Sequence, residues 1–374
     1  MTTTGEKLRV GLIFGGRSVE HRVSLDSACA VMDHLDPKKY EVVPIGITRE
    51  GAWLPGISPG TWLALSESAN DSDVLEAEPT ALVEATYHHL ILNKPRQPLW
   101  PVDQTIDVVF PVLHGTYGED GAIQGLLEMA RVPYVGCGVL GSALGMDKEK
   151  MKMIFRSVGL QTVDSLSYSR QRWQRDPEAI MDAIELRLGY PCFVKPANGG
   201  SSIGVGKAYH RADLQSMIDD AIHYDSKIVI ERAILCRELG CSVVGNSDPL
   251  VSVVGEAVTN HDFYDYHAKY CDTSSEVIIP ADIPEEISTR VREQALQAFQ
   301  ALDLSGLARV DFFLERGTNQ LYINEVNTLP SFTPQCMYPR LCEVSGLPYA
   351  LLLDCLIELA LERHTDRQRN YVSI

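Results

Sequence analysis

Apolar runs along the first 135 residues predict strands that alternate with helices. Leu8 to Phe14 is a run typical of a buried strand, and two glycines end it. Ser24 is expected to cap an amphipathic helix that reaches about Leu35. Further strands are expected at Asp107 to Leu113 and at Pro133 to Val135, with an apolar helix between them. This alternation predicts a parallel, doubly wound sheet that binds ligands at the carboxyl ends of its strands.

The middle of the chain predicts a second unit. Asp147 can cap a helix that Gly159 ends. Two strands are expected near Cys192 to Lys195 and Ile228 to Glu231. The glycine-rich turn Asn198 to Gly206 and a helix would join them.

Beyond residue 232 the pattern changes to longer strands, and a helix that begins near Pro284 interrupts them. The expected strands are Gly240 to Val244, Leu250 to Ala257, Leu307 to Leu314 and Gln320 to Val326. We therefore expect an α/β protein, α+β in its C-terminal part, with domains at residues 1–143, 144–231 and 232–374. Residues 50 to 100 give the weakest signal.

The net charge of the chain limits the classes of molecule that it is expected to bind. The 374 residues include 33 Lys and Arg against 50 Asp and Glu, a formal charge of −17. Such a surface repels a phosphate backbone at long range, which argues against nucleic acid. An anionic small-molecule ligand would need a local concentration of basic residues.

The cysteine pattern and the apolar runs bear on the compartment. Nine cysteines lack metal-binding spacing, and the first ten residues lack the apolar stretch of a signal peptide. The longest apolar runs fall far short of the ~20 residues of a membrane span. We expect reduced thiols in a cytoplasmic protein that does not enter a membrane.

Two strands near the C-terminus carry the strongest chemical signal. Arg309 and Asp311 share one face of a predicted strand, and Glu325 and Asn327 share a face of the next. Side by side, these groups suit Mg²⁺, which takes oxygen ligands and keeps water or phosphate as the rest. The alternative is an ion pair between adjacent strands. Four such groups among apolar neighbours are costly to bury without a ligand, which favours the metal site.

A second signal is the segment from Phe193 to Gly204. Lys195 ends a buried strand, and the following loop offers many free N–H groups that can cradle a triphosphate. It is not a Walker A loop, because no Gly-Lys-Ser/Thr opens a helix. A tight solvent loop that needs glycine dihedrals is the alternative.

Several single residues are candidates for binding a ligand, but no motif around them fixes their role. Lys148 could present a second ammonium, Glu231 and Glu238 could accept from adenine and ribose, and Glu20 could hold an ammonium group. Surface, capping or helix-start roles are the alternatives for each. The polar, aromatic segment 263–270 is typical of a lid.

Together these segments resemble one family. They are Gly15–His21, His114–Gly121, Met146–Lys148, Val194–Gly204, Tyr264–Tyr270, Ala308–Asp311 and Asn324–Thr328. In this order they resemble the D-alanine–D-alanine ligases of the ATP-grasp superfamily over about residues 7 to 363.

The resemblance implies a three-domain ligase, usually a homodimer, that uses ATP and two Mg²⁺ ions, with Mn²⁺ as an alternative ion. Its substrates would be D-alanine and ATP. The implied nucleotide contacts are Lys148, Lys195, Ser202, Glu231, Glu238, Lys269 and Asn324. The implied metal ligands are Asp311, Glu325 and Asn327.

The resemblance also implies residues for the amino acids. Glu20, Ser201 and Tyr270 would form a hydrogen-bonded set that ties a lid at about 260–282 to the N-terminal domain. Arg309 and the Ser331 N–H would stabilise an oxyanion, in a reaction that forms an acyl phosphate. The implied substrate contacts are Glu20, His114, Lys269, Arg309, Ser331, Cys336 and Met337.

Three positions depart from the family. Ser331 replaces the usual glycine, Cys336 the usual serine, and His267 a commonly acidic lid residue. A thiol is a weaker donor than a hydroxyl, so the second substrate is open to question. Tyr270 resembles members that add D-alanine.

Three functions therefore stay in view. We expect synthesis of D-alanyl-D-alanine for peptidoglycan precursors. The same chemistry with another second D-amino or hydroxy acid is the first alternative. A non-catalytic nucleotide-binding homologue is the alternative from another class.

Overall fold

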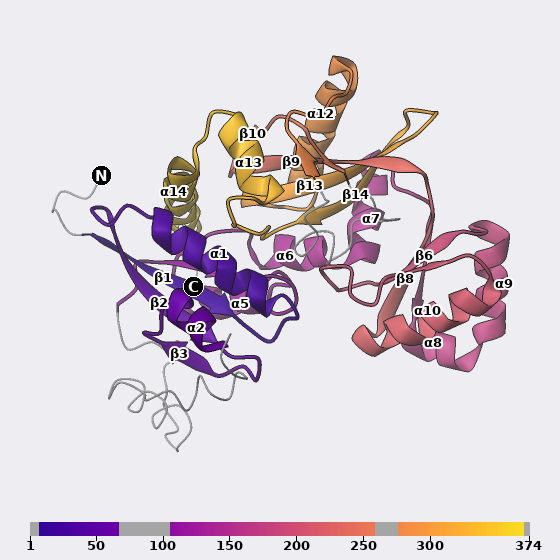
Figure 1. The fold of residues 1–374 in the computed structure, drawn as a ribbon, viewed down its shortest axis with the longest axis horizontal. Coiled ribbons are helices and arrows are strands. Elements are labelled where there is room, and N and C mark those ends of the chain that lie inside the picture. The colour runs from indigo at the N-terminus through magenta and orange to yellow at the C-terminus, as the bar shows by residue number, and fades with distance from the viewer. Residues whose placement is uncertain (1–6, 67–104, 259–275, 370–374) are drawn as a thin grey trace.

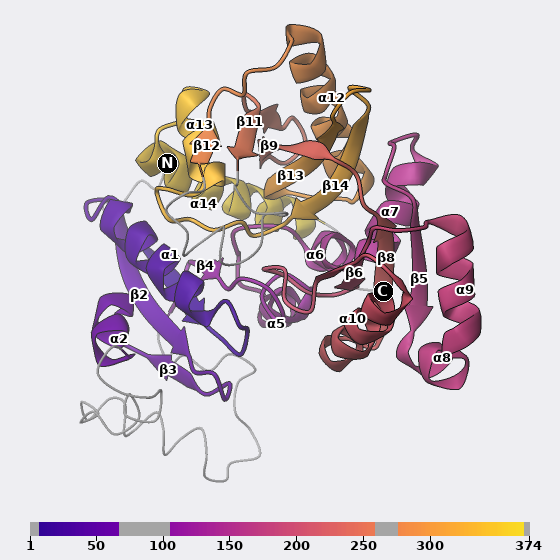
Figure 2. The same cartoon turned by 45° about the vertical axis from the view of Figure 1, so that its right-hand side comes forward.

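Three sheets follow one another along the chain (Figures 1 and 2). The computed structural model describes residues 7–66, 105–258 and 276–369. The sheets change between residues 112 and 165 and between residues 232 and 236. The domain limits at 143 and 231 stay a prediction.

The first sheet has the order β3-β2-β1-β4, and its neighbours β1–β2 and β1–β4 are parallel. Its strands are β1 (Leu8–Gly15), β2 (Tyr40–Ile47), β3 (Trp53–Pro55) and β4 (Val108–Val112). The edge strand β3 runs antiparallel to β2. The helices here are α1 (His21–His34), α2 (Pro59–Ser66) and α5 (Ala122–Ala130). α1 packs in one apolar cluster and α5 in another, so helices cover both faces as predicted.

Two local predictions in this region are wrong. Ser24 does not cap α1 but lies inside it, where its Oγ accepts a 2.7 Å hydrogen bond from the Gly15 N–H and donates to the Val112 carbonyl. It thus ties α1 to the ends of β1 and β4. The strand expected at Pro133 to Val135 makes only a single bridge, between Val109 and Tyr134.

The second sheet is antiparallel, in the order β5-β8-β6-β7. Its strands are β5 (Ser165–Ser169), β6 (Cys192–Pro196), β7 (Gly206–Ala208) and β8 (Lys227–Arg232). The helices of this part are α8 (Arg170–Arg175), α9 (Pro177–Arg187) and α10 (Arg211–Tyr224). The predicted glycine-rich turn lies between β6 and β7.

The third sheet is also antiparallel, in the order β12-β11-β9-β13-β14, with β10 beside β9. Its strands are β9 (Cys236–Gly245), β10 (Leu250–Val251), β11 (Gly255–Val258), β12 (Glu276–Ile278), β13 (Gly306–Glu315) and β14 (Leu321–Asn327). The single strand predicted at Leu250 to Ala257 is thus two strands. α12 (Glu285–Ala301) begins after Pro284 as predicted.

Helices that precede the second sheet in sequence pack against the third. α6 (Val139–Met146) and α7 (Lys148–Ser157) both contact β14. Met151 and Phe155 of α7 are buried in the same apolar cluster as Val310 and Phe299. α7 therefore places its first residue, Lys148, beside the third sheet.

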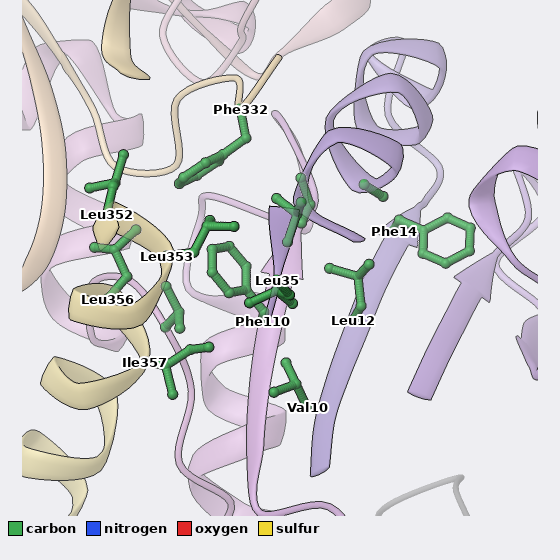
Figure 3. Packing of buried hydrophobic residues seen from close by; sticks show 14 of the residues in the cluster. Val10, Leu12, Phe14, Leu35, Phe110, Phe332, Leu352, Leu353, Leu356 and Ile357 are labelled. Atoms are coloured by element: carbon green, nitrogen blue, oxygen red, sulfur yellow. The ribbon is translucent and has the colours of Figure 1, made fainter. Parts of the chain in front are cut away.

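The C-terminal helices close the core of the first sheet. They are α13 (Met337–Val344) and α14 (Tyr349–Arg367). Leu353 and Ile357 of α14 and Phe332 share a cluster with Leu12 and Phe110 (Figure 3). The loop after β14 is thereby fastened to the first sheet.

Among the helices of the described ranges, none alone is long and apolar enough to cross a membrane; α13 and α14 meet that test only as a pair bent by 100°.

Candidate active site

A cleft of about 900 Å³ is lined by strands of the second and third sheets, by α1, and by the loops that follow β4, β6 and β14. It brings together every predicted site residue that the structure describes. They are Glu20, His114, Lys148, Lys195, Ser201, Ser202, Glu231, Glu238, Arg309, Asp311, Asn324, Glu325, Asn327, Ser331, Cys336 and Met337. Lys269, Tyr270, His267 and most of the predicted lid lie outside the described residues.

β13 and β14 form the floor at which the predicted metal ligands meet. The register sets Asp311 opposite Glu325 and Arg309 opposite Asn327. Residues opposite each other on antiparallel strands project to the same face, so all four groups share one face. A register shift follows directly after Asp311.

Arg309 and Asp311 form a forked ion pair. Nε and Nη2 of Arg309 donate to Oδ1 and Oδ2 of Asp311, each over 2.8 Å. The ion pair considered from the sequence therefore exists, but within one strand.

The donor set of the floor fits a hard cation. Within the described ranges no group of three or more His, Cys, Asp or Glu is placed to hold a metal ion. Two carboxylates, Asp311 and Glu325, and the amide of Asn327 are what this face offers. Mg²⁺ suits such a set, because it takes its remaining ligands from water and phosphate.

Lys148 reaches the floor from the start of α7. Asp147 caps this helix as predicted, by accepting a 3.0 Å hydrogen bond from the Lys150 N–H. The Nζ of Lys148 donates to the Gly199 carbonyl over 2.7 Å and lies 3.6 Å from Oε2 of Glu325. Lys148 therefore links the glycine-rich loop to the face of β13 and β14 that carries the predicted metal ligands.

The glycine-rich loop closes onto the N-terminal sheet. Ser201 and Ser202 have φ angles of 49° and 56°, which is unusual for two successive residues other than glycine. The Ser201 hydroxyl donates to Oε1 of Glu20. A Cβ on Gly200 would lie 2.6 Å from Oε2 of Glu20, so a side chain at this position would displace the Glu20 carboxylate or the loop.

Glu231 lies at the back of the cleft between two lysines. Its Oε2 accepts a 2.8 Å hydrogen bond from Lys195, and its Oε1 lies 2.9 Å from Nζ of Lys152. Burial opposes ionisation of Glu231, but Lys152 and Lys195 outweigh it and hold the pKa of that carboxyl below its ordinary value. Glu238 lies nearby on β9, opposite Phe313.

Buried side chains order the loop after β14. Burial lowers the pKa of His114 and favours the neutral ring. Its Nδ1 can then donate to the Leu329 carbonyl at 2.8 Å, while Nε2 accepts from Ser27 at 3.1 Å. The Ser27 hydroxyl contacts Oγ of Ser331 at 3.1 Å, and Sγ of Cys336 lies 3.2 Å from that Oγ. Ser331 and Cys336, two of the three positions that depart from the family, are therefore in direct contact.

Three residues of this site were missed from the sequence: Ser27, Glu119 and Lys152. Glu119 accepts hydrogen bonds from the backbone N–H groups of Gly115, over 2.7 Å, and Leu329, over 3.0 Å. Burial, and then Glu20, raise the pKa of Glu119 to about 8. The spacing of Lys152, four residues after Lys148 on one helix, was a usable signal.

Comparisons with known proteins agree with this geometry. The family model described as D-ala D-ala ligase N-terminus matches residues 9–137, and that described as D-ala D-ala ligase C-terminus matches residues 154–358. The chain belongs to the D-alanine–D-alanine ligase family. A relative in Geobacillus thermodenitrificans, a D-alanine–D-alanine ligase, is 49% identical over 97% of this chain and 98% of its own length.

Solved structures show the same architecture. The VanG D-Ala:D-Ser ligase from Enterococcus faecalis has a TM-score of 0.77 and is 34% identical, over 95% of this chain and 100% of that one. The D-alanine–D-alanine ligase from Bacillus anthracis, complexed with ATP, has a TM-score of 0.71 and is 30% identical, over 97% of this chain and 99% of that one. The predicted multidomain ATP-grasp fold is confirmed.

Proposed function

We propose that this chain joins two D-alanines to D-alanyl-D-alanine at the expense of ATP, for peptidoglycan precursors. The observation that carries the proposal is the meeting of Lys148 and Lys195 with the floor of Arg309, Asp311 and Glu325 in one cleft. The named family relatives support the same activity.

ATP would lie between the second and third sheets. Lys148, Lys195 and the backbone N–H groups of the loop with Ser202 would meet the phosphates, because all of these residues line the cleft and such groups suit a triphosphate. Glu238, with Glu231 behind it, would receive the ribose and adenine. Asn324 and Lys269 complete the predicted nucleotide contacts.

Asp311, Glu325 and Asn327 would hold the magnesium ions. Bound there, the ions would supply positive charge that neutralises phosphate oxygens during transfer. Manganese offers the same charge and ligand preference.

The first D-alanine would bind beneath the glycine-rich loop. Glu20 offers a carboxylate to its ammonium group, with His114 nearby. Ser201, and by resemblance Tyr270, would hold Glu20 in place.

The reaction would run in two steps. The carboxylate of the first D-alanine attacks the γ-phosphorus, forming an acyl phosphate and releasing ADP. The neutral amine of the second D-alanine then attacks the acyl carbon, forming the C–N bond, and the proton that the nitrogen loses passes to the departing phosphate. Arg309 and the Ser331 N–H would stabilise the oxyanion until the C–O bond breaks and phosphate leaves. Exclusion of water by the lid would protect the acyl phosphate from hydrolysis.

Cys336 and Met337, with Ser331, would contact the second amino acid. The homodimer, the lid and the cytoplasmic location stay predictions from the sequence.

The test is a product assay on the purified chain with ATP, Mg²⁺ and an equimolar mixture of D-alanine, D-serine and D-lactate. We expect D-alanyl-D-alanine as the main product by mass spectrometry, with phosphate release that requires D-alanine. A preferred D-serine or D-lactate product would identify the specialised alternative. ADP formation indifferent to D-alanine would contradict ligation altogether.

A further inference from the structure

A fully buried lysine with no role in the mechanism above lies behind the phosphate-facing lysine. Lys152 is only 2% exposed and lies one helical turn after Lys148 on α7. Its Nζ is 2.9 Å from Oε1 of Glu231, so the two groups form an ion pair that is almost fully buried. Burying an ammonium group is costly, so its position calls for an explanation.

The charges of Lys152, Glu231 and Lys195 supply that explanation. Glu231 alone would cancel the charge of Lys195, whose Nζ it contacts at 2.8 Å. Adding Lys152 gives two positive charges against one negative, so a net positive charge faces the cleft. In a chain with a formal charge of −17, such local compensation decides whether a phosphate is attracted.

We propose that Lys152 is a positioning residue for ATP: it compensates Glu231 and so leaves the charge of Lys195 available to the phosphates. This inference rests on the proposed role of Lys195 as a phosphate contact. The pKa values agree, since burial lowers that of Lys195 but Glu231 and Glu325 outweigh it and raise it. Burial lowers the pKa of Lys152, and Glu231 opposes that shift.

The first test is Lys152→Met, which removes the charge and keeps the length of the side chain. We expect the KM for ATP to rise on the order of tenfold, with the KM for D-alanine nearly unchanged. The matched control is Lys150→Met, on the same helix, whose exposed side chain pairs with Glu149 at 3.2 Å. The control should keep the KM for ATP. Equal rises in both KM values, or in both variants, would overturn the inference.

The second test asks whether Lys152 acts through Glu231. In a Glu231→Gln background there is no carboxylate to compensate, so adding Lys152→Met should change the KM for ATP by less than about twofold. The same tenfold rise in that background would overturn the inference. The double variant buries neutral groups in place of the ion pair, so its KM for ATP can be compared directly with that of the parent chain where Lys152→Met or Glu231→Gln alone does not fold.

Lys195→Met separates this inference from the role on which it rests. A raised KM for ATP in Lys195→Met but not in Lys152→Met contradicts the inference alone. An unchanged KM for ATP in Lys195→Met would contradict the proposed contact between Lys195 and the phosphates.

Discussion

Arg309 and Asp311, two residues apart on β13, are joined by two parallel hydrogen bonds of 2.8 Å. This fork holds the guanidinium and the carboxylate on one face, opposite Asn327 and Glu325. The group proposed for the oxyanion and a group proposed for the metal are therefore held in place by each other. Losing either one should disturb both functions.

Asp311→Asn tests this coupling. The amide keeps the size but loses the charge, so we expect kcat to fall on the order of 10²-fold or more. The Mg²⁺ concentration for half-maximal rate should rise, measured by phosphate release. Glu315→Gln, at the far end of β13 and outside the cleft, is the matched control. Equal Mg²⁺ dependence in Asp311→Asn and the parent chain would refute the metal assignment.

Glu325→Ala should abolish turnover while sparing the fold, because Glu325 is the second carboxylate of the floor. Activity and the thermal unfolding midpoint are the two measurements. Substantial ligation by a folded variant would be incompatible with a metal role.

Gly200→Ala tests closure of the glycine-rich loop. Its Cβ would lie 2.6 Å from Oε2 of Glu20, whereas a Cβ on Gly199 meets only Pro196, at 3.5 Å. Pushing the loop from Glu20 displaces the binding groups by about an ångström, which can cost on the order of 10²-fold in rate. Gly199→Ala should lose far less. The measurement is the steady-state rate of each variant. Equal losses of rate in Gly200→Ala and Gly199→Ala would mean that closure of the loop onto Glu20 is not required.

Ser27→Ala tests the ordering of the loop after β14. It removes the hydroxyl between His114 and Ser331, so we expect a higher KM for D-alanine and a loss of about 1–3 kcal/mol in the free energy of unfolding. Ser142→Ala removes an equally buried hydroxyl from α6, which donates to the Cys137 carbonyl over 3.5 Å. A KM shift of the same size there would show that the effect is not local.

The free energy of unfolding should depend on pH through Glu119. Its pKa is about 8 in the folded chain, and its ordinary value is 4.5. The folded state therefore binds the proton more tightly, so this contribution is full below about pH 4.5 and is lost as pH rises towards 8. Glu20 and Arg309 are the charges that act on it, and His114 lies nearby.

Glu119→Gln isolates this contribution. The amide loses one backbone hydrogen bond at every pH, which gives a constant offset. Denaturant unfolding at pH 5.5, 7 and 8.5 should show the variant gaining on the parent chain as pH rises. A difference that stays constant across this range would contradict the raised pKa.

The sequence by itself determined the parallel core of the first sheet, the cap at Asp147, the paired faces of β13 and β14, and the family. These features follow from local periodicity, from side chains two apart on a strand, and from ordered motifs, all of which read along the chain.

Tertiary structure alone decided the rest. Ser24 ties α1 to two strand ends, Glu119 joins two loops, and Lys152 lies against Glu231, 79 positions away in the chain. A polar residue gives the same local signal whether it is solvated or buried. Only packing of distant segments removes water from such groups, and that desolvation turns an ordinary serine, glutamate or lysine into a structural or electrostatic element of the site.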